Sequence, residues 1–358
     1  MEAICRVSLD AITNNFQYFQ DRVLPAQVIP VVKANAYGHG AVEVTQHLHQ
    51  ELGVTLFAVA TLEEACQLAT AFPQISILIF SRVFAEELIH LPENTILTIG
   101  SMEDASMLRN SVHAGIKVHL NVNTGMNRLG LSPDQAMELI ADPKFPLAIE
   151  GVYSHYSSSD TEKATVFSQQ NEMFKNFVMR TRQHGFKGMI HMSNSAGTLH
   201  SGQEHYDAVR LGIGLYGYDT TPGQQHQQFL EPVMEVLAPL VRVERIRIGE
   251  SVSYSEKWRA SIDTNIGTLR IGYADGYSRA LTNRGMVSFQ GKTYPVIGTV
   301  TMDHIMIDLG QEFVSSGSLF TVMGGEIPSV QVASIASMLN TITYEICCGI
   351  SPRVVRKY

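Results

Sequence analysis

The sequence predicts an α/β fold, namely a (β/α)8 TIM barrel followed by a C-terminal, mainly β domain. The chain has 358 residues, more than the roughly 250 that such a barrel needs. Its first part alternates short apolar runs with stretches of helical periodicity, whereas its last part consists mainly of short apolar runs joined by turns. We therefore divide the chain into a barrel domain at 1–228 and a mainly β domain at 229–358.

Eight apolar or β-branched runs supply the strands of the expected barrel. They are 27–32, 54–60, 75–80, 95–99, 116–122, 147–153, 188–192 and 207–215. Helices are expected between them, for instance at 62–70, at 102–112 and at 161–183, the last with Asp160 as its N-cap. Parallel strands joined by right-handed crossovers favour a closed barrel, because an open sheet would expose two edges. An open, doubly wound sheet is the alternative.

The pattern changes after a loop at 220–228 that is rich in glycine, proline and glutamine. Only one short helix is expected beyond it, at 330–339. The expected strands are 240–248, 268–272, 286–290, 294–309 and 319–323. The C-terminal domain should therefore be mainly β.

Composition and charge narrow the class of protein. Hydrophobic residues make up 45% and charged residues 17% of the chain, as in globular proteins with a sizeable core. The net charge of −8 argues against a nucleic-acid partner. No apolar run approaches the roughly 18 residues of a membrane span, and none near the N-terminus resembles a signal peptide. We expect a cytoplasmic protein without a membrane partner.

Cysteine and histidine spacing argues against disulfides and metal sites. The four cysteines have no paired CxxC spacing and are interpreted as reduced thiols. They are Cys5, Cys66, Cys347 and Cys348. No HExxH motif and no cluster of histidine and acidic ligands occurs in the sequence, so we expect no catalytic metal.

The first predicted strand of the barrel ends at a lysine, Lys33, after a fully apolar run. The active site of such a barrel lies at the C-terminal ends of its strands. An amine that is removed from water there has a lowered pKa, which favours Schiff-base chemistry with an aldehyde. A surface lysine is the ordinary alternative.

Other strand ends carry candidate ligands for an anion. Arg128 lies in a glycine-containing loop after the fifth strand, and Arg210 lies in the eighth. His155 follows the sixth strand, although a lone histidine is more often a core residue. Asn194 and Ser195 open a short helix after the seventh strand, where backbone N–H groups can bind an anion.

The segment 212–217 formally matches the dinucleotide-binding pattern GxGxxG. A dinucleotide site needs a helix that opens inside the motif and an acidic residue at a later strand end, whereas a loop follows here. Gly212 and Ile213, after strand eight, instead suit the phosphate site that barrels build from their last two loops.

Eight short motifs together resemble the alanine racemase family of enzymes, which use pyridoxal 5'-phosphate (PLP). In chain order they are VVKANAYGHG, TGMNRLG, SHY, NSAGT, VRLGIGLYG, SVSYSEKW, IGYADGY and TVTMDH. The resemblance extends from about Val7 to Tyr358. It implies a barrel plus a β domain, and a head-to-tail homodimer whose active sites take residues from both subunits. It also implies interconversion of L- and D-alanine, which supplies D-alanine for peptidoglycan.

The resemblance also implies a role for each matching residue toward the cofactor. Lys33 would form the Schiff base with PLP, His155 would lie against the pyridine ring, and Arg128 would lie by the phenolic oxygen. Arg210 would lie at the pyridine nitrogen. The implied phosphate ligands are Tyr37, Ser195, Gly212, Ile213 and Tyr344, with Asn194 beside them.

Catalysis by two bases is implied as well. Lys33 would act on one face of the substrate Cα, and Tyr254 of the partner subunit would act on the opposite face. Met302 would also reach the substrate from the partner subunit, and Tyr273 would lie near the entrance. Together with Arg128, Met302 and Tyr273 are the expected substrate-binding residues.

Two positions depart from the pattern of many family members. Asn121 stands where they have a carbamylated lysine, and Asn123 stands where they have an aspartate. We hypothesise that a small anion such as chloride lies near Asn121 and holds Arg128. Because some relatives with a broader substrate range also lack that lysine, serine is the first alternative substrate.

Two other functions are the alternatives. A PLP-dependent decarboxylase with the same domains predicts an acidic residue at the pyridine nitrogen and a catalytic cysteine, and Arg210 and Tyr254 fit neither. A non-catalytic PLP-binding barrel would resemble the first domain alone, and the motif SVSY in the second argues against it. A biosynthetic and a catabolic racemase would have the same sequence pattern.

Overall fold

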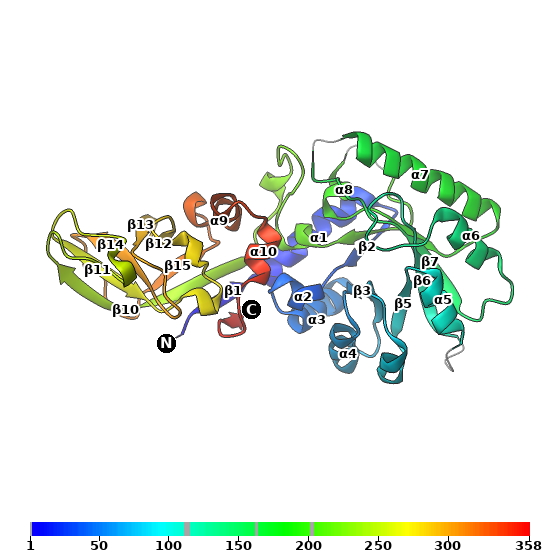
Figure 1. Cartoon of the computed structure of the whole chain (residues 1–358), viewed down its shortest axis with the longest axis horizontal. Helices are drawn as coiled ribbons and strands as arrows, with labels where there is room; N and C mark the ends of the chain where they lie inside the picture. The colour runs from blue at the N-terminus through cyan, green and yellow to red at the C-terminus, as the bar shows by residue number, and fades with distance from the viewer. Residues whose placement is uncertain (1, 111–114, 162–163, 201–203) are drawn as a thin grey trace. The chain divides into compact units, whose positions relative to one another are not determined.

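A computed structural model describes residues 2–110, 115–161, 164–200 and 204–358 (Figure 1). The chain forms two compact units. The barrel unit comprises Asp10–Ala36 and Ala41–Glu231, and the β unit comprises Met1–Leu9, Tyr37–Gly40 and Pro232–Tyr358. Among the described residues, no helix is long and apolar enough to cross a membrane.

Eight parallel strands form the sheet of the barrel unit. They are β2 (Gln27–Pro30), β3 (Leu56–Val59), β4 (Ser76–Ile79), β5 (Thr95–Ile99), β6 (Lys117–Asn121), β7 (Ala148–Tyr153), β8 (Met189–His191) and β9 (Ala208–Leu211). They pair in the order β2-β9-β8-β7-β6-β5-β4-β3. A parallel bridge between Val31 and Ala58 joins the two end strands. The sheet therefore nearly closes, which confirms the predicted barrel and rules out the open sheet.

Each predicted strand of the barrel is present, although most are shorter than predicted. Strands such as β3 (LFAV) and β4 (SILI) are buried along nearly their whole length, as expected where helices cover one face and barrel side chains the other. The eighth strand ends at Leu211 rather than at 215, because the chain turns at Gly212 into the short 3-10 helix η2 (Ile213–Tyr216).

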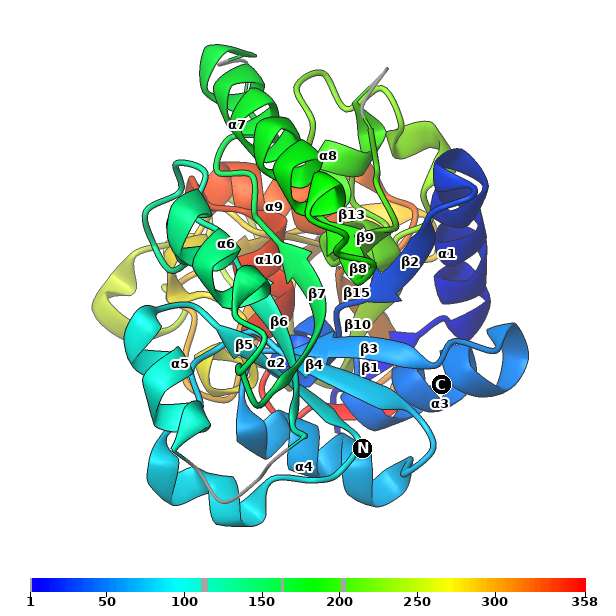
Figure 2. The same ribbon diagram turned by 90° about the vertical axis from the view of Figure 1, so that its right-hand side faces the viewer.

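Helices lie around the outside of these strands (Figure 2). They are α1 (Leu9–Val23), α3 (Ala41–Leu52), α4 (Leu62–Ala71), α5 (Met102–Arg109), α6 (Pro133–Ala141) and α7 (Ala164–Gln183), with the short α8 (Ser195–Leu199) after β8. Thr61, Ser101 and Ser132 cap α4, α5 and α6 through their side chains.

Two predicted helix ends lie next to residues that the structure does not describe. The predicted start of α7 behind Asp160 adjoins undescribed residues: Thr161 lies in a bend, and α7 is described from Ala164. Residues 162–163 lie outside the described residues. The helix predicted at 102–112 ends at Arg109 with Asn110 as its C-cap, and positions 111–112 are also outside the description.

The β unit contains a mostly antiparallel sheet with the order β11-β14-β13-β12-β15-β10-β1-β16. Its strands are β1 (Ile4–Val7), β10 (Met234–Ile246), β11 (Thr264–Leu269), β12 (Met286–Phe289), β13 (Lys292–Ile297), β14 (Ile305–Gly310), β15 (Leu319–Met323) and β16 (Val355–Lys357). The helices α9 (Val332–Leu339) and α10 (Thr343–Cys348) complete it. The mainly β character of this part of the chain is therefore confirmed.

The predicted single strand 294–309 is wrong. It is two strands, β13 and β14, with a loop between them. Gly298 begins this loop with a φ of 68°, and a Cβ there would lie 2.6 Å from the carbonyl oxygen of Val252. A glycine is required at this turn, and the loop carries Met302.

Candidate active site

Lys33 directly follows the end of β2 and begins the short turn α2 (Lys33–Tyr37). Residues 34–37 all have left-handed backbone conformations, with φ between 51° and 54°. Such a conformation costs residues with a Cβ about 1–2 kcal/mol each, so surrounding contacts must impose it. The half-buried Lys33 is therefore followed directly by a strained backbone segment that surrounding contacts keep in place.

The Glu64 carboxylate supplies one of those contacts. Its Oε1 accepts a hydrogen bond from the N–H of Ala34 at 2.7 Å, and its Oε2 accepts one from the N–H of Ala60 at 2.8 Å. Glu64 is also part of the capping box of α4. The residue next to Lys33 is thereby fixed to the end of the neighbouring strand β3.

Arg210 lies in β9 and is 2% exposed. Its Nη1 lies 2.7 Å from Nδ1 of His191, and its Nη2 lies 3.0 Å from Nδ1 of His155. Nη2 also donates to the carbonyl oxygens of Ser154 and Met192, at 2.7 and 3.0 Å. All four acceptors are neutral. Burial lowers the pKa of Arg210 to about 10, so the guanidinium remains charged at pH 7.

Three positively charged side chains act on the imidazole of His155. Burial, and then the charges of Arg210, Arg128 and Lys33, hold the pKa of His155 well below its usual range. The imidazole is therefore neutral at pH 7. Because a guanidinium can only donate, Nδ1 of His155 accepts from Arg210 and the ring proton lies on Nε2. The predicted residues Lys33, Arg128, His155 and Arg210 thus come together at the ends of the barrel strands.

Asn123 organises the loop that carries Arg128. Its Oδ1 accepts hydrogen bonds from the N–H groups of Gly125 and Asn127 at 3.0 and 3.1 Å, and its Nδ2 donates to Oδ1 of Asn127 at 2.9 Å. Asn127 has a φ of 57°, which asparagine tolerates better than most residues. The amide of Asn123 thereby places Arg128, which is exposed.

The loops after β8 and β9 are joined through Ser195. Its Oγ accepts hydrogen bonds from the N–H groups of Gly212 and Gly214 at 3.0 and 3.1 Å. Asn194 caps α8, because its Oδ1 accepts from the N–H of Gly197 at 2.8 Å. The predicted phosphate residues Ser195, Gly212 and Ile213 therefore lie together. The first N–H groups of α8 have no partner within the helix, as at any helix start.

The other predicted site residues lie in the β unit. Tyr37 and Tyr344 are neighbours, with ring centroids 5.9 Å apart. Tyr254, Tyr273 and Met302 are 67%, 42% and 51% exposed. Their side chains are therefore accessible to another molecule.

The sequence did not point to His119 and His191. Nε2 of His191 lies 3.0 Å from Nδ1 of His119, and the ring of His191 stacks on Tyr153 with centroids 5.0 Å apart. The Tyr153 hydroxyl lies 3.0 Å from Oγ1 of Thr98. These buried polar groups extend from Arg210 through the barrel interior. Among the described residues, no group of three or more His, Cys, Asp or Glu side chains could hold a metal ion.

Models of two protein families match the chain. The alanine racemase N-terminal domain matches residues 7–220, and the alanine racemase C-terminal domain matches residues 233–358. The chain is 38% identical to an alanine racemase of Treponema pallidum, over 93% of each chain. It is 35% identical to that of a Nostoc species, over 98% of this chain and 94% of the relative.

Solved structures are similar over the whole chain. The alanine racemase of Enterococcus faecalis has a TM-score of 0.90 at 31% identity, covering 100% of this chain and 98% of the other. Alanine racemase from Bartonella henselae with covalently bound pyridoxal phosphate has a TM-score of 0.88 at 28% identity, covering 100% and 99%.

Proposed function

The chain belongs to the alanine racemase family, whose members are isomerases, and we propose that it interconverts L- and D-alanine with PLP as its cofactor. The observation that carries the proposal is Lys33 at a barrel strand end, together with a His155 whose pKa is lowered by burial and by the charges of Arg210, Arg128 and Lys33. A reactive amine among cations suits a cofactor that has an aldehyde and anionic groups.

The charges of the site support PLP in particular. PLP carries a phosphate group and an anionic phenolic oxygen, and the positive charge of Arg210 is not compensated by its four hydrogen-bond acceptors, which are all neutral. Arg128 adds a second cation near His155. We propose that Lys33 binds the cofactor covalently, Arg128 its phenolic oxygen and His155 its ring. The proposed phosphate ligands are Tyr37, Asn194, Ser195, Gly212, Ile213 and Tyr344.

Arg210 is the proposed neighbour of the pyridine nitrogen. A guanidinium can donate a hydrogen bond to that nitrogen but cannot accept a proton from it, and it gives up its own proton reluctantly. Arg210 therefore leaves the nitrogen unprotonated. A carboxylate, which many PLP enzymes use there, would instead favour the protonated form.

Proton transfer is the work of two side chains. When bound, PLP withdraws electrons from the amino acid attached to it and makes its α-proton acidic. The Lys33 amine removes or returns that proton on one face of the Cα, and Tyr254 of the partner subunit does so on the other. Two proton-transfer groups on opposite faces produce racemisation.

A homodimer is part of the proposal, with each active site completed by the partner subunit. Its support is the exposure of Tyr254, Tyr273 and Met302 in the β unit. We further propose a chloride ion near Asn121 that holds Arg128, a cytoplasmic location, and a role in supplying D-alanine for peptidoglycan. Serine is the alternative substrate.

The test is racemisation by the purified dimer. L-alanine and L-serine are incubated separately with the enzyme, and the D-enantiomers are measured over time. We expect D-alanine to form faster than D-serine. Lys33→Ala should lose both activity and the visible absorption of the lysine-bound cofactor, whereas the exposed-lysine control Lys187→Ala should keep both. Absence of D-enantiomers with a cofactor-loaded enzyme would overturn the proposed reaction.

A further inference from the structure

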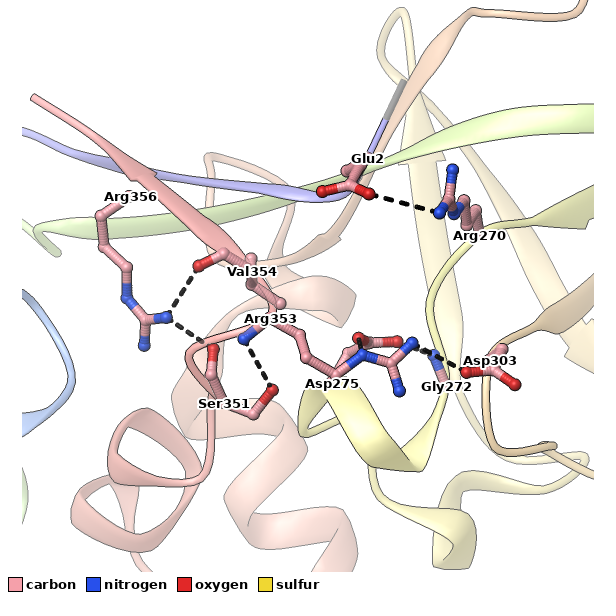
Figure 3. A network of polar contacts seen from close by, with 9 residues as sticks. All are labelled: Glu2, Arg270, Gly272, Asp275, Asp303, Ser351, Arg353, Val354 and Arg356. Carbon is pink, nitrogen blue, oxygen red and sulfur yellow. Dashed lines mark hydrogen bonds and ion pairs between the residues drawn. The ribbon is translucent and has the colours of Figure 1, made fainter.

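Three chain segments of the β unit meet around Arg353 (Figure 3). The first is the 3-10 helix η5 (Tyr273–Asp275), the second is the loop with Met302 and Asp303, and the third is the C-terminal segment at 349–353. The first two carry the exposed side chains of Tyr273 and Met302, the expected substrate-binding residues of this unit, Tyr273 near the entrance and Met302 reaching the substrate. Their relative position therefore bears on which substrates enter.

The backbones of the first two segments are in direct contact. The N–H of Tyr273 donates to the carbonyl oxygen of Thr301 at 3.0 Å, and the N–H of Ala274 donates to that of Met302 at 3.1 Å. A Cβ on Gly272 would lie 2.3 Å from the Met302 carbonyl oxygen. Only glycine permits this approach, so the two exposed side chains stand on adjacent backbones.

Arg353 ties the two segments together with its guanidinium. Its Nε lies 3.1 Å from Oδ1 of Asp275, and its Nη2 lies 2.8 Å from Oδ1 of Asp303. Figure 3 shows both ion pairs. The rigid fork of a guanidinium holds two carboxylates at a fixed separation, which the single ammonium of a lysine cannot do.

The Asp275 carboxylate links Arg353 to the backbone of the first segment. Asp275 is 7% exposed, and its Oδ2 accepts the N–H of Gly272 at 2.9 Å. Its carbonyl oxygen accepts the N–H of Ser351 at 3.1 Å. Asp303 immediately follows Met302, so the other arm of Arg353 acts next to the second entrance side chain.

We propose that Arg353 is a positioning residue for substrate selection, which holds Tyr273 and Met302 at the separation that admits a methyl side chain and hinders a larger one. This inference rests on the proposed function. The Arg353 side chain is 52% exposed, and ion pairs so exposed contribute little to the free energy of unfolding. Its effect should therefore appear in substrate selection rather than in stability.

The experiment compares four variants of the cofactor-loaded dimer by kcat and KM for L-alanine and L-serine. Arg353→Gln removes both ion pairs, Arg353→Lys keeps one contact at a time, and Asp303→Asn removes only the negative charge of the exposed pair while keeping a hydrogen-bond acceptor. Lys292→Gln is the control, because it breaks the exposed Lys292–Glu312 pair of the same unit, at 2.8 Å, away from both entrance segments.

We expect Arg353→Gln to raise the KM for alanine roughly tenfold, with a smaller change in kcat, because misplaced binding groups weaken a reaction steeply. The preference in kcat/KM for alanine over serine should fall. Asp303→Asn should show part of the effect, Arg353→Lys should restore part of it, and Lys292→Gln should behave as wild type.

An unchanged KM and an unchanged alanine preference in Arg353→Gln would overturn the inference while leaving the proposed function intact. If Arg353→Gln does not fold, the same kinetic comparison is made with Asp303→Asn. An unchanged preference for alanine in that variant would then overturn the inference. If the wild-type enzyme racemises neither amino acid, the proposed function fails first and the inference fails with it.

Discussion

The Nδ1 atom of His191 lies 2.7 Å from Nη1 of Arg210, and this contact determines which imidazole nitrogen carries the proton. Arg210 can only donate, so Nδ1 of His191 accepts and its proton lies on Nε2. That Nε2 lies 3.0 Å from Nδ1 of His119, which must accept in turn. One buried arginine therefore sets the tautomers of His191, His119 and His155.

Acid should destabilise the protein through these three histidines. Burial is the main cause of the lowered pKa in each, with the value for His119 at about 3. Because the unfolded chain binds protons at about pH 6.5, the unfolded state is favoured as the pH falls below that value. The contribution of these histidines to the free energy of unfolding is fully present above about pH 6.5. It is lost as the pH falls toward 3, by about 1.4 kcal/mol per pH unit for each fully shifted histidine.

Urea unfolding at pH 7.5, 6.5 and 5.5 measures this loss. His119→Gln keeps a hydrogen-bond acceptor for His191 but cannot be protonated, so its stability should fall less steeply with acid than that of wild type. His184→Gln is the control, since His184 is exposed in the folded protein as well as in the unfolded chain. Equal slopes for His119→Gln and wild type would contradict the assignment.

Gly151→Ala should disturb the same histidines by steric contact. A Cβ at Gly151 would lie 2.6 Å from Cε1 and Nε2 of His119, and the buried ring has little room to move. We expect a loss of about 1–3 kcal/mol in unfolding free energy. Gly100→Ala is the control, because its nearest atoms are 3.7 Å away. Adding His119→Ala should relieve part of the strain, and purely additive effects would argue against a direct clash.

The barrel could be predicted from the sequence because its strands are buried on both faces and read as uninterrupted apolar runs. The strands β1 and β16 could not. They have four and three residues, with burial that alternates or fails, and their pairing joins the two ends of the chain. The helix α10 was missed for a related reason, since six residues are too few to show helical periodicity.

The position of Lys33 at a strand end was predictable, because the apolar run before it marks the strand. His119 and His191 lie inside strands, where an isolated histidine looks like any core residue. Only the register of the closed barrel brings them to Arg210. Arg353 is 78 residues from Asp275 and 50 from Asp303, and nothing in the spacing of single charges indicates that they meet.

Chloride should activate the enzyme if an anion near Asn121 holds Arg128. Replacing chloride by acetate at constant ionic strength should raise the KM for alanine several-fold in the wild type, by mass action on the bound ion. Asn121→Ala should show the higher KM in both salts. A wild-type KM that is the same in chloride and acetate would contradict the proposed chloride ion near Asn121.

Tyr254→Phe should slow racemisation strongly without affecting folding. The phenol is 67% exposed, and its backbone is held by a hydrogen bond from Oγ1 of Thr299 to its carbonyl oxygen at 2.8 Å, which the substitution leaves in place. Removing one of the two proposed proton-transfer groups should lower kcat by roughly 10²–10⁴-fold. The unfolding midpoint should stay at the wild-type value, and Tyr358→Phe, at another exposed tyrosine, serves as the control.

Hydrogen exchange in heavy water separates the two faces of the substrate in this variant. Lys33 still acts on its own face, so one enantiomer of alanine should exchange its α-hydrogen with the solvent and keep its configuration, while the other should exchange slowly. Equal slow exchange of both enantiomers would mean that Tyr254 supports a step common to both directions. Racemisation at the wild-type rate would mean that another group, or water, supplies the second proton.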